Sequence, residues 1–145
     1  MPSLDSLPVE LIFRILNLLE IHEIIFSLRP VCRYLKDAID NYNVYSNINL
    51  RSIPKQYFLP ICSRIQPEEV TSLTLSNETP TAGEITWLFS LINVERLICL
   101  QSLTLIEVGD TVLMNLLTSI RLFKNLSKFS IIESKRRETY VSAKI

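Results

Sequence analysis

The N-terminal part of the chain carries apolar residues at helical spacing. Two neighbouring stripes run from about Pro8 to Leu19, one made of Val9, Ile12, Leu16 and Leu19 and the other of Leu11, Ile15 and Leu18. Proline at the start of a helix sacrifices no hydrogen bond, and Glu10 complements the positive end of the helix dipole. The pattern therefore predicts a helix whose apolar arc is wider than one small core requires.

Two shorter helices are predicted to follow. One spans residues 21–28, and Pro30 then interrupts the pattern and can open another helix through about Ile39, so that the unit ends near Asn43. Three helices of this length bury too little surface to be comfortably stable alone. We therefore expect another subunit to cover the second stripe of the first helix.

After Asn43 the pattern changes to short runs with the alternation of β-strands. The runs share the spacing LxxLxL and consist of Tyr45, Ile48 and Leu50; Val70, Leu73 and Leu75; Leu100, Leu103 and Leu105; and Leu126, Phe129 and Ile131. Their middle residues are separated by 25, 30 and 26 positions. Each interval has room for a strand, a turn and a return helix, so the spacing indicates an internal repeat.

The segments between the runs have helical patterns. Thr81 and Glu84 can form a capping box before an apolar stripe that ends at Ile92, and Asp110 can cap a further helix through Ile120. A shorter helix or two is predicted between Pro54 and Ile65. Repeats of this kind stack into a curved solenoid with parallel strands on the concave side, because one repeat cannot bury its own apolar face. The solenoid is expected to be truncated near Ile145, since no capping repeat is evident.

The composition narrows the class of partner. Fifteen basic residues balance fifteen acidic ones, which disfavours nucleic acid or an anionic membrane as a partner. The one basic cluster, residues 135–137, is interpreted as a solvated terminus. Cys32, Cys62 and Cys99 are odd in number and lack CxxC spacing, as expected of buried free thiols in the cytoplasm or nucleus. No signal peptide or membrane span is indicated.

Candidate catalytic chemistry is sparse. The chain has a single histidine, His22, and only two glycines, Gly83 and Gly109, so neither a nucleophile with its base nor a phosphate-binding loop can be assigned. His22 is expected to be a surface or capping residue. The sequence predicts no catalytic residues, no metal and no cofactor.

The stretch from Leu4 to Leu35 resembles the F-box. The F-box motif LxxLPxEL is matched by Leu4, Leu7, Pro8, Glu10 and Leu11. It is followed by an isoleucine-rich helix and then by the valine–cysteine pair Val31 and Cys32. The remainder resembles the leucine-rich repeats that often follow an F-box. This resemblance implies an α/β chain overall, with a three-helix F-box, residues 1–44, fused to a short leucine-rich-repeat solenoid, residues 45–145, with parallel strands and return helices.

Several positions depart from the family pattern. The interval from Pro8 to Val31 is slightly longer than is typical, with Pro30 at the place that would absorb the difference. Leu35 stands where a large aromatic residue is common, and Tyr34 beside it can supply the ring. In the repeats, Glu78, Val108 and Ser134 stand where asparagine is expected, with Asn77 one place early, which predicts degenerate repeats.

F-box proteins bind a Skp-type adaptor, which holds a cullin scaffold with the ubiquitin-conjugating enzyme. The resemblance therefore implies a non-catalytic substrate adapter of an SCF-type (Skp–cullin–F-box) E3 ubiquitin ligase, whose partners are the Skp-type adaptor, through it a cullin, and an unidentified protein substrate. The motif positions at or near the adaptor interface are Leu7, Pro8, Leu11, Ile12, Ile15, Val31, Cys32 and Leu35. Each is either an adaptor contact or part of the core of the three-helix unit.

The residues between the leucines of the strands form the candidate substrate surface. They are Asn47, Asn49, Arg51, Ser72, Thr74, Ser76, Ser102, Thr104, Lys128 and Ser130. The simpler interpretation is that they are ordinary solvated strand positions. An alternative for the whole chain is a protein-interaction scaffold with an F-box-like docking head and no part in ubiquitin transfer.

Overall fold

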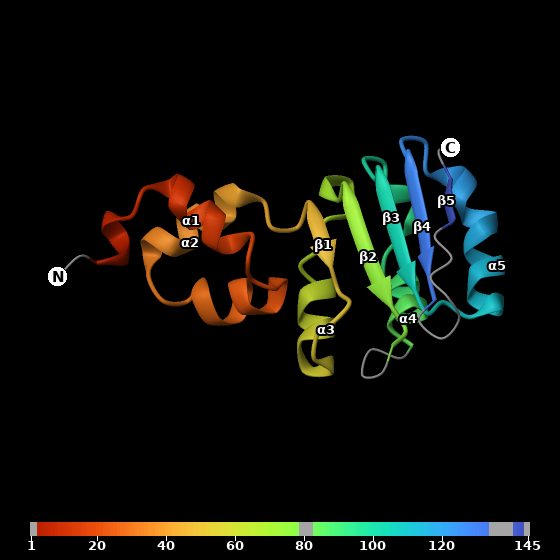
Figure 1. Cartoon of the computed structure of the whole chain (residues 1–145), viewed down its shortest axis with the longest axis horizontal. Helices are drawn as coiled ribbons and strands as arrows, with labels where there is room; N and C mark the ends of the chain where they lie inside the picture. The colour runs from red at the N-terminus through yellow and green to blue at the C-terminus, as the bar shows by residue number, and fades with distance from the viewer. Residues whose placement is uncertain (1–2, 79–82, 134–140, 144–145) are drawn as a thin grey trace. The chain divides into compact units, whose positions relative to one another are not determined.

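The computed structural model describes residues 3–78, 83–133 and 141–143. The chain divides into two compact units, Met1–Val44 and Tyr45–Ile145, and the division falls where the sequence pattern changes (Figure 1). Helices and strands are mixed, and four of the strands form a parallel sheet, which confirms the predicted α/β class. Thr81, Ser134 and the basic cluster 135–137 lie outside the described residues.

The N-terminal unit contains four helical elements. They are the 3-10 turn η1 (Leu4–Ser6), α1 (Val9–Leu16), the π-helical segment η2 (Glu23–Leu28) and α2 (Arg33–Tyr42). The predicted first helix was too long, since α1 ends at Leu16 and Asn17 caps it. The predicted third helix was placed too early, because α2 begins at Arg33, after an extended Cys32, and ends where Asn43 adopts a left-handed φ of 55°.

The segment η2 lies within the slightly long interval between Pro8 and Val31. The backbone N–H of Arg29 donates to the carbonyl of Ile24 at 2.9 Å, a bond that spans five residues where an α-helix spans four. A π turn thus holds one residue more than an α turn. This turn lies just before Pro30, the place where the extra residue was expected to be absorbed.

The core of the N-terminal unit lies between α1 and α2. Buried residues from the three longer elements fill it: Ile12, Leu16, Ile24, Ile25, Leu35, Ala38 and Ile39. At the end of the two helices, the rings of Phe13 and Tyr42 lie 5.3 Å apart, and the Tyr42 hydroxyl donates to Asn17. These contacts hold the helix ends together.

The C-terminal unit is built on a sheet of five strands in chain order. The strands are β1 (Asn47–Asn49), β2 (Ser72–Ser76), β3 (Ser102–Ile106), β4 (Lys128–Ile132) and β5 (Val141–Ala143). The first four are parallel, and β5 pairs antiparallel with β4 (Figure 1). The register aligns Ile48, Leu73, Leu103 and Phe129, which confirms the predicted equivalence of these residues. Strand β5 was not predicted.

The backbone hydrogen bonds repeat from strand to strand. One carbonyl just before each of β1, β2 and β3 accepts two N–H donors from the next repeat, at 2.8 to 3.1 Å: Ser46 from Thr71 and Ser72, Thr71 from Gln101 and Ser102, and Gln101 from Ser127 and Lys128. Equivalent positions therefore make equivalent bonds although the repeats differ in length. This regularity lies in the strands, where the sequence repeats as well.

Helices connect the strands. They are α3 (Lys55–Cys62), α4 (Glu84–Leu91) and α5 (Asp110–Ser119), with the 3-10 turns η3 (Pro67–Glu69), η4 (Val94–Arg96) and η5 (Ile120–Leu122). Apolar residues of these helices and of the strands form the core, among them Phe58, Ile85, Leu88, Leu73, Leu75, Leu103 and Leu105.

Both predicted helix starts need correction. Glu84 is the first residue of α4, after Gly83 with a φ of 85°, so it is not the third helical residue that a capping box with Thr81 requires. Asp110 is likewise the first residue of α5, and Gly109 occupies the cap position. Glycine tolerates the left-handed backbone at Gly83 without steric cost, which explains why the helix begins there.

Candidate adaptor-docking surface

The two apolar stripes of α1 have different environments. In the first stripe, Ile12 and Leu16 are each only 1% exposed and belong to the core, whereas Val9 is 38% exposed. Leu11, Ile15 and Leu18 are exposed to 42%, 43% and 86%. The second stripe is therefore not covered, in agreement with the surplus of apolar surface expected from the sequence.

The segment before α1 is tied to the start of α2. The Tyr34 hydroxyl donates to the carbonyl of Leu7 at 2.7 Å, and the Cys32 thiol lies 3.5 Å from a carboxylate oxygen of Asp5. Tyr34, which was expected to supply an aromatic ring, thus also positions Leu7. These two bonds bring together the leucine–proline and valine–cysteine parts of the motif, which are far apart in sequence.

Most of the predicted adaptor-binding positions are accessible. Pro8 and Val31 are exposed, the latter to 58%, and Leu7 and Cys32 are half-buried. We use the name docking stripe for the apolar residues Leu11, Ile15, Leu18 and Val31, together with Pro8.

Ile12 and Leu35 need correction as adaptor contacts. Ile12 is 1% exposed and Leu35 is 2% exposed, because Ile12 lies on the stripe of α1 that faces the core and Leu35 lies on the core side of α2. Both residues hold the unit together and offer almost no surface to a partner. The sequence signal was the same for all the apolar motif positions, so it could not separate these two from the others.

The charged residues of this unit form exposed or partly exposed pairs. Arg29 lies 3.0 Å from Asp40, and His22 lies 3.3 Å from Glu20. Pairs of this kind contribute little to stability. The surface or capping role expected for His22 needs correction, because its side chain is only 17% exposed and makes no capping hydrogen bond at the start of η2.

The comparisons with known proteins concern this unit. Residues 4–47 match the F-box domain family. They form an F-box domain. F-box domains bind Skp-type adaptors, and proteins that carry them are generally non-catalytic substrate adapters. No curated protein and no solved structure matched the chain. The motif from Leu4 to Leu35 thus lies wholly inside the F-box domain, which extends to residue 47, at the beginning of β1.

The candidate substrate surface is assembled by the sheet. The parallel register places Asn47, Ser72, Ser102 and Lys128 in one row and Asn49, Thr74, Thr104 and Ser130 in a second row. All are half-exposed or exposed, whereas the alternating residues Leu73, Leu75, Leu103 and Leu105 are buried. Strand alternation therefore sends one set of side chains into the core and the polar set to the opposite face. We call these two rows the polar sheet face.

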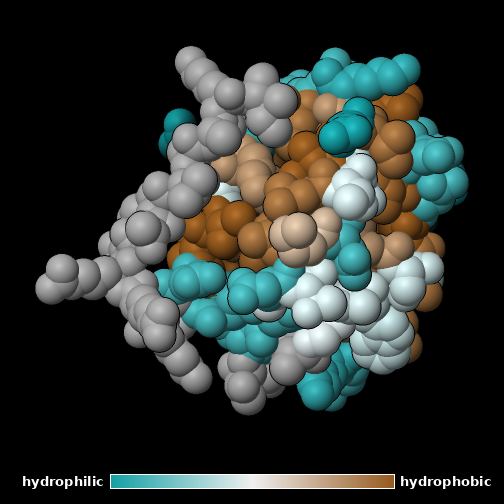
Figure 2. Space-filling view, turned by 90° about the vertical axis from the view of Figure 1, so that its right-hand side faces the viewer, coloured by the Kyte–Doolittle hydropathy of each residue, from teal (hydrophilic) through white to brown (hydrophobic). Residues whose placement is uncertain are grey.

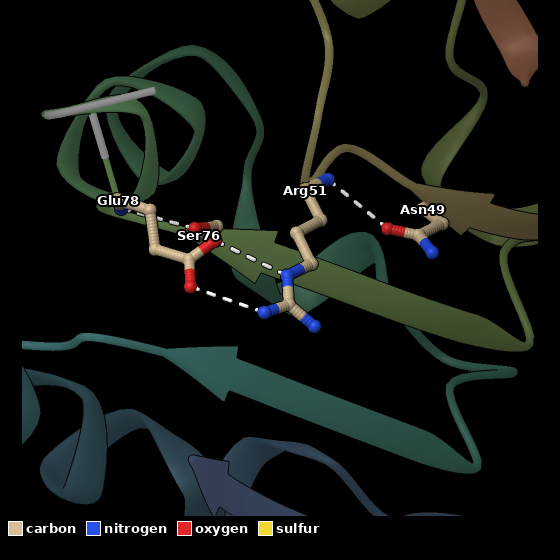
Figure 3. A network of polar contacts seen from close by, with 4 residues as sticks. All are labelled: Asn49, Arg51, Ser76 and Glu78. Atoms are coloured by element: carbon tan, nitrogen blue, oxygen red, sulfur yellow. Dashed lines mark hydrogen bonds and ion pairs between the residues drawn. The ribbon is translucent and has the colours of Figure 1, made fainter. Parts of the chain in front are cut away.

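Ser76 and Arg51 do not belong to the polar sheet face. Ser76 is fully buried, and its hydroxyl accepts the backbone N–H of Glu78 at 3.0 Å. Arg51 lies beyond β1, and two of its guanidinium nitrogens donate to the two carboxylate oxygens of Glu78, each at 3.1 Å (Figure 3). The backbone N–H of Arg51 also donates to the side chain of Asn49 at 3.0 Å. The predicted substrate contact at Ser76 is wrong, and Arg51 is held by its bidentate partner.

Asn77 has a structural role that its position in the sequence obscured. Its side-chain oxygen accepts the backbone N–H of Ile85 at 3.3 Å, and its own N–H donates to the carbonyl of Ile106 at 2.9 Å. Asn77 thus joins the end of β2 both to α4 and to the next strand. Asn77 stands one position before the place where the repeat pattern expects an asparagine, and it still hydrogen-bonds to the backbone of Ile85 and Ile106.

Two ionisable groups are buried inside the C-terminal unit. Glu84 is 2% exposed, and neither of its carboxylate oxygens has a hydrogen-bond partner among the described residues. Burial raises the pKa of Glu84 to about 7, with Lys55 acting in the opposite direction. Burial and then the nearby Glu84 raise the pKa of Cys62 to about 12, so this thiol is protonated and unreactive at neutral pH.

The other two cysteines differ from their prediction. Cys32 and Cys99 are half-buried, and only Cys62 is buried, although all three are free thiols. In the described ranges, no group of three potential metal-ligating side chains was found. No helix among the described residues is long and apolar enough to span a bilayer.

Proposed function

We propose that this chain is a substrate-recognition adapter of an SCF-type E3 ubiquitin ligase in the cytoplasm or nucleus. Its F-box domain binds a Skp-type adaptor and, through it, a cullin. Its C-terminal unit, a short and degenerate leucine-rich-repeat solenoid, binds the protein substrate. The chain itself catalyses no step and needs neither metal nor cofactor. Its contribution to ubiquitin transfer is to hold the substrate near the conjugating enzyme.

The exposed docking stripe of the F-box domain is the observation that supports this function most directly. Leu11 and Ile15 are exposed to 42% and 43% on a helix whose opposite side is sealed in the core. Apolar surface of this kind on a small unit marks a binding site for another protein. A standard interface of about 1,600 Å² in total would cover it and stabilise the domain.

The polar sheet face is the proposed substrate-binding surface. Its two rows combine hydroxyl and amide side chains from four strands, with Lys128 as the charged member. Short hydroxyl side chains lose little conformational entropy on binding and can both donate and accept hydrogen bonds. The proposed substrate is therefore a protein segment that offers backbone and polar groups along the strands.

An affinity measurement with a purified Skp-type adaptor tests the first part of the proposal. We expect Leu11→Glu with Ile15→Glu to weaken adaptor binding at least about a hundredfold, because two charges would be buried without partners. Leu59→Glu is the matched control, since Leu59 is exposed to 44% on α3 of the other unit. Equal adaptor affinity for the double variant and the control would refute the docking stripe.

A variant of the motif loop complements this test. Leu7→Ala with Pro8→Ala alters the segment before α1 and leaves the helix face intact. We expect it to reduce adaptor binding because Leu7 and Pro8 border the docking stripe. Its circular dichroism spectrum should remain that of the native chain.

The alternative function is a protein-interaction scaffold whose F-box domain takes no part in ubiquitin transfer. Both functions predict binding of the Skp-type adaptor, but only the ligase function predicts that a cullin joins the complex. Co-purification of the chain, the adaptor and a cullin therefore distinguishes them. An adaptor complex that excludes the cullin would favour the scaffold.

A further inference from the structure

Two neighbouring helices of the C-terminal unit present a face without charge. Residues 85–94, which cover nearly all of α4, and residues 111–120, which cover nearly all of α5, contain no Asp, Glu, Lys or Arg. Glu84, at the start of α4, is buried, and exposed charged residues stand only at the ends of the two segments: Asp110, Glu95, Arg96 and Arg121. In contrast, α2 of the F-box domain has charged residues at four exposed positions, Arg33, Lys36, Asp37 and Asp40.

Large apolar side chains project from this face. Trp87 and Leu91 on α4 are exposed to 48% and 52%, and Met114 and Leu117 on α5 are exposed to 64% and 44%. The remaining exposed positions of residues 85–94 and 111–120 are Ser, Thr or Asn. On the side of the molecule that carries α5, Figure 2 shows a broad hydrophobic area bordered by hydrophilic residues. We use the name uncharged helix face for the exposed side chains of these two segments.

The face combines ridges with a groove. A groove of about 320 Å³ runs between α4 and α5, and no ionisable side chain lines it; Phe89, Val94, Val112 and Leu116 supply its apolar wall. On the side of α4 that contacts α3, the Trp87 ring stacks on Phe58 at 5.7 Å with an interplanar angle of 19°. Since Phe58 is fully buried, Trp87 is held by the core on one side and exposed on the other.

We propose that the uncharged helix face is a docking surface for a second copy of this chain. In a twofold dimer the same patch meets itself, so every charge near the axis would face its own like charge. A patch free of charge avoids this repulsion, and the formal net charge of zero adds no long-range repulsion between copies. Ridges and a groove on one face allow each copy to place its ridge in the groove of the other.

The size of the face sets the strength of the dimer. Helices of 8 and 10 residues are roughly 12 and 15 Å long, so their combined face is smaller than the roughly 800 Å² per partner of a standard interface. The dimer is therefore weak and forms in the micromolar range or above. Trp and Met are enriched at interface cores while Lys, Glu and Asp are depleted, which is the composition found here.

Sedimentation velocity of the full chain, alone and bound to a Skp-type adaptor, tests the dimer. We expect the weight-average mass to rise from monomer to dimer as the concentration increases from low to high micromolar. The single variants Leu91→Glu and Met114→Glu should each weaken self-association at least about tenfold, because each places a charge opposite its copy. Ile98→Glu is the matched control, since Ile98 is exposed to 53% outside the two helices and should leave the dimer intact.

Each result of this experiment either supports the dimer or overturns it. Circular dichroism identifies any variant that fails to fold, and the other variant then decides. A native chain that remains monomeric at the highest concentration overturns the proposal, whatever other protein binds this face. Dimers that persist in folded Leu91→Glu and Met114→Glu also overturn it. Since adaptor binding is measured separately, loss of the dimer and loss of the proposed ligase function are independent results.

Discussion

The F-box domain and the C-terminal unit both leave apolar helix surface uncovered, but they differ in whether charged residues lie along the same helices. The docking stripe of α1 shares its helix with the exposed charges Glu10 and Arg14. The uncharged helix face has no charge over residues 85–94 and 111–120. Charges along a docking helix orient a partner of different sequence, whereas a patch with charges only at its ends can meet its own copy without repulsion at its centre.

The two units also differ in how their cores are built. The F-box domain depends on a few helix contacts, such as that between Phe13 and Tyr42, which lie close to the ends of its helices. The C-terminal unit has a ladder of backbone bonds that repeats from β1 to β4. A small helical unit without such a ladder depends more on a partner, because little surface is buried inside it.

The largest expected loss of stability comes from substitutions in the cores of the two units. Leu103→Ala in the central strand and Leu35→Ala in α2 each remove a side chain that is at most 2% exposed, and each should cost about 2 to 5 kcal/mol of unfolding free energy. Urea denaturation followed by circular dichroism measures this cost. We expect Leu103→Ala to leave adaptor affinity unchanged and Leu35→Ala to reduce it. If Leu103→Ala reduced adaptor affinity and Leu35→Ala did not, the adaptor would not depend on the F-box domain in the way this comparison requires.

The next effect is a pH dependence that arises in the C-terminal unit. Because the pKa of Glu84 rises from 4.5 in the unfolded chain to about 7 in the folded one, the folded state holds a proton that the unfolded state has released. Stability is therefore fully present below the unfolded pKa and falls as pH rises through about 7, by up to about 3 kcal/mol. Urea midpoints measured over this pH range test it.

Glu84→Gln provides the control for this pH dependence. The amide keeps the size of the side chain but has no proton to lose in this range. We expect the variant to have a flatter stability profile and to be more stable than the native chain above neutral pH. An unchanged profile in Glu84→Gln would assign the dependence to another group.

A smaller effect is expected at the loop of the F-box domain. Tyr34→Phe removes the hydroxyl that donates to the Leu7 carbonyl at 2.7 Å and keeps the ring, so it should cost about 0.5 to 1.5 kcal/mol. The loss should appear in adaptor affinity as well as in stability, because the bond positions the motif loop. Titration calorimetry with the adaptor measures the first, and thermal denaturation measures the second.

The smallest effect is expected for the ion pair of Arg51 and Glu78. The side chain of Arg51 is 47% exposed, so the pair should contribute only about 0.2 to 1 kcal/mol despite its bidentate geometry. A double-mutant cycle with Arg51→Ala and Glu78→Ala isolates the contribution. Added salt should reduce it, and a coupling energy well above this range would indicate that the pair is more strongly shielded from solvent than its exposure suggests.

Much of the repeat architecture could be predicted from spacing. Ile48, Leu73, Leu103 and Phe129 are in register because a shift by one residue would turn the leucines away from the core. The helix starts were less predictable. Gly83 and Gly109 occupy the cap positions that were expected at Thr81 and Asp110.

The candidate sites were predicted only in part. The motif identified the helix that carries the docking stripe, but the packing of α2 against α1 decided that Leu11 is exposed and Ile12 is buried. In the sheet, alternation predicted an accessible Ser76, yet Ser76 is buried and bonded to the backbone of Glu78. The lack of charged residues in the uncharged helix face could be seen in the sequence, but only the structure showed that its large apolar side chains are exposed.

The order of residues alone determined the change from helical to strand periodicity, the equivalence of the repeats and the F-box motif, because all of these are local patterns of apolar and polar side chains. Tertiary structure decided which stripe of α1 is covered, where η2 forms a π turn, and how Glu84 comes to be buried without a hydrogen-bond partner among the described residues. The reason is physical. Burial and pKa depend on neighbours that are distant in the sequence, and a local pattern does not specify those neighbours.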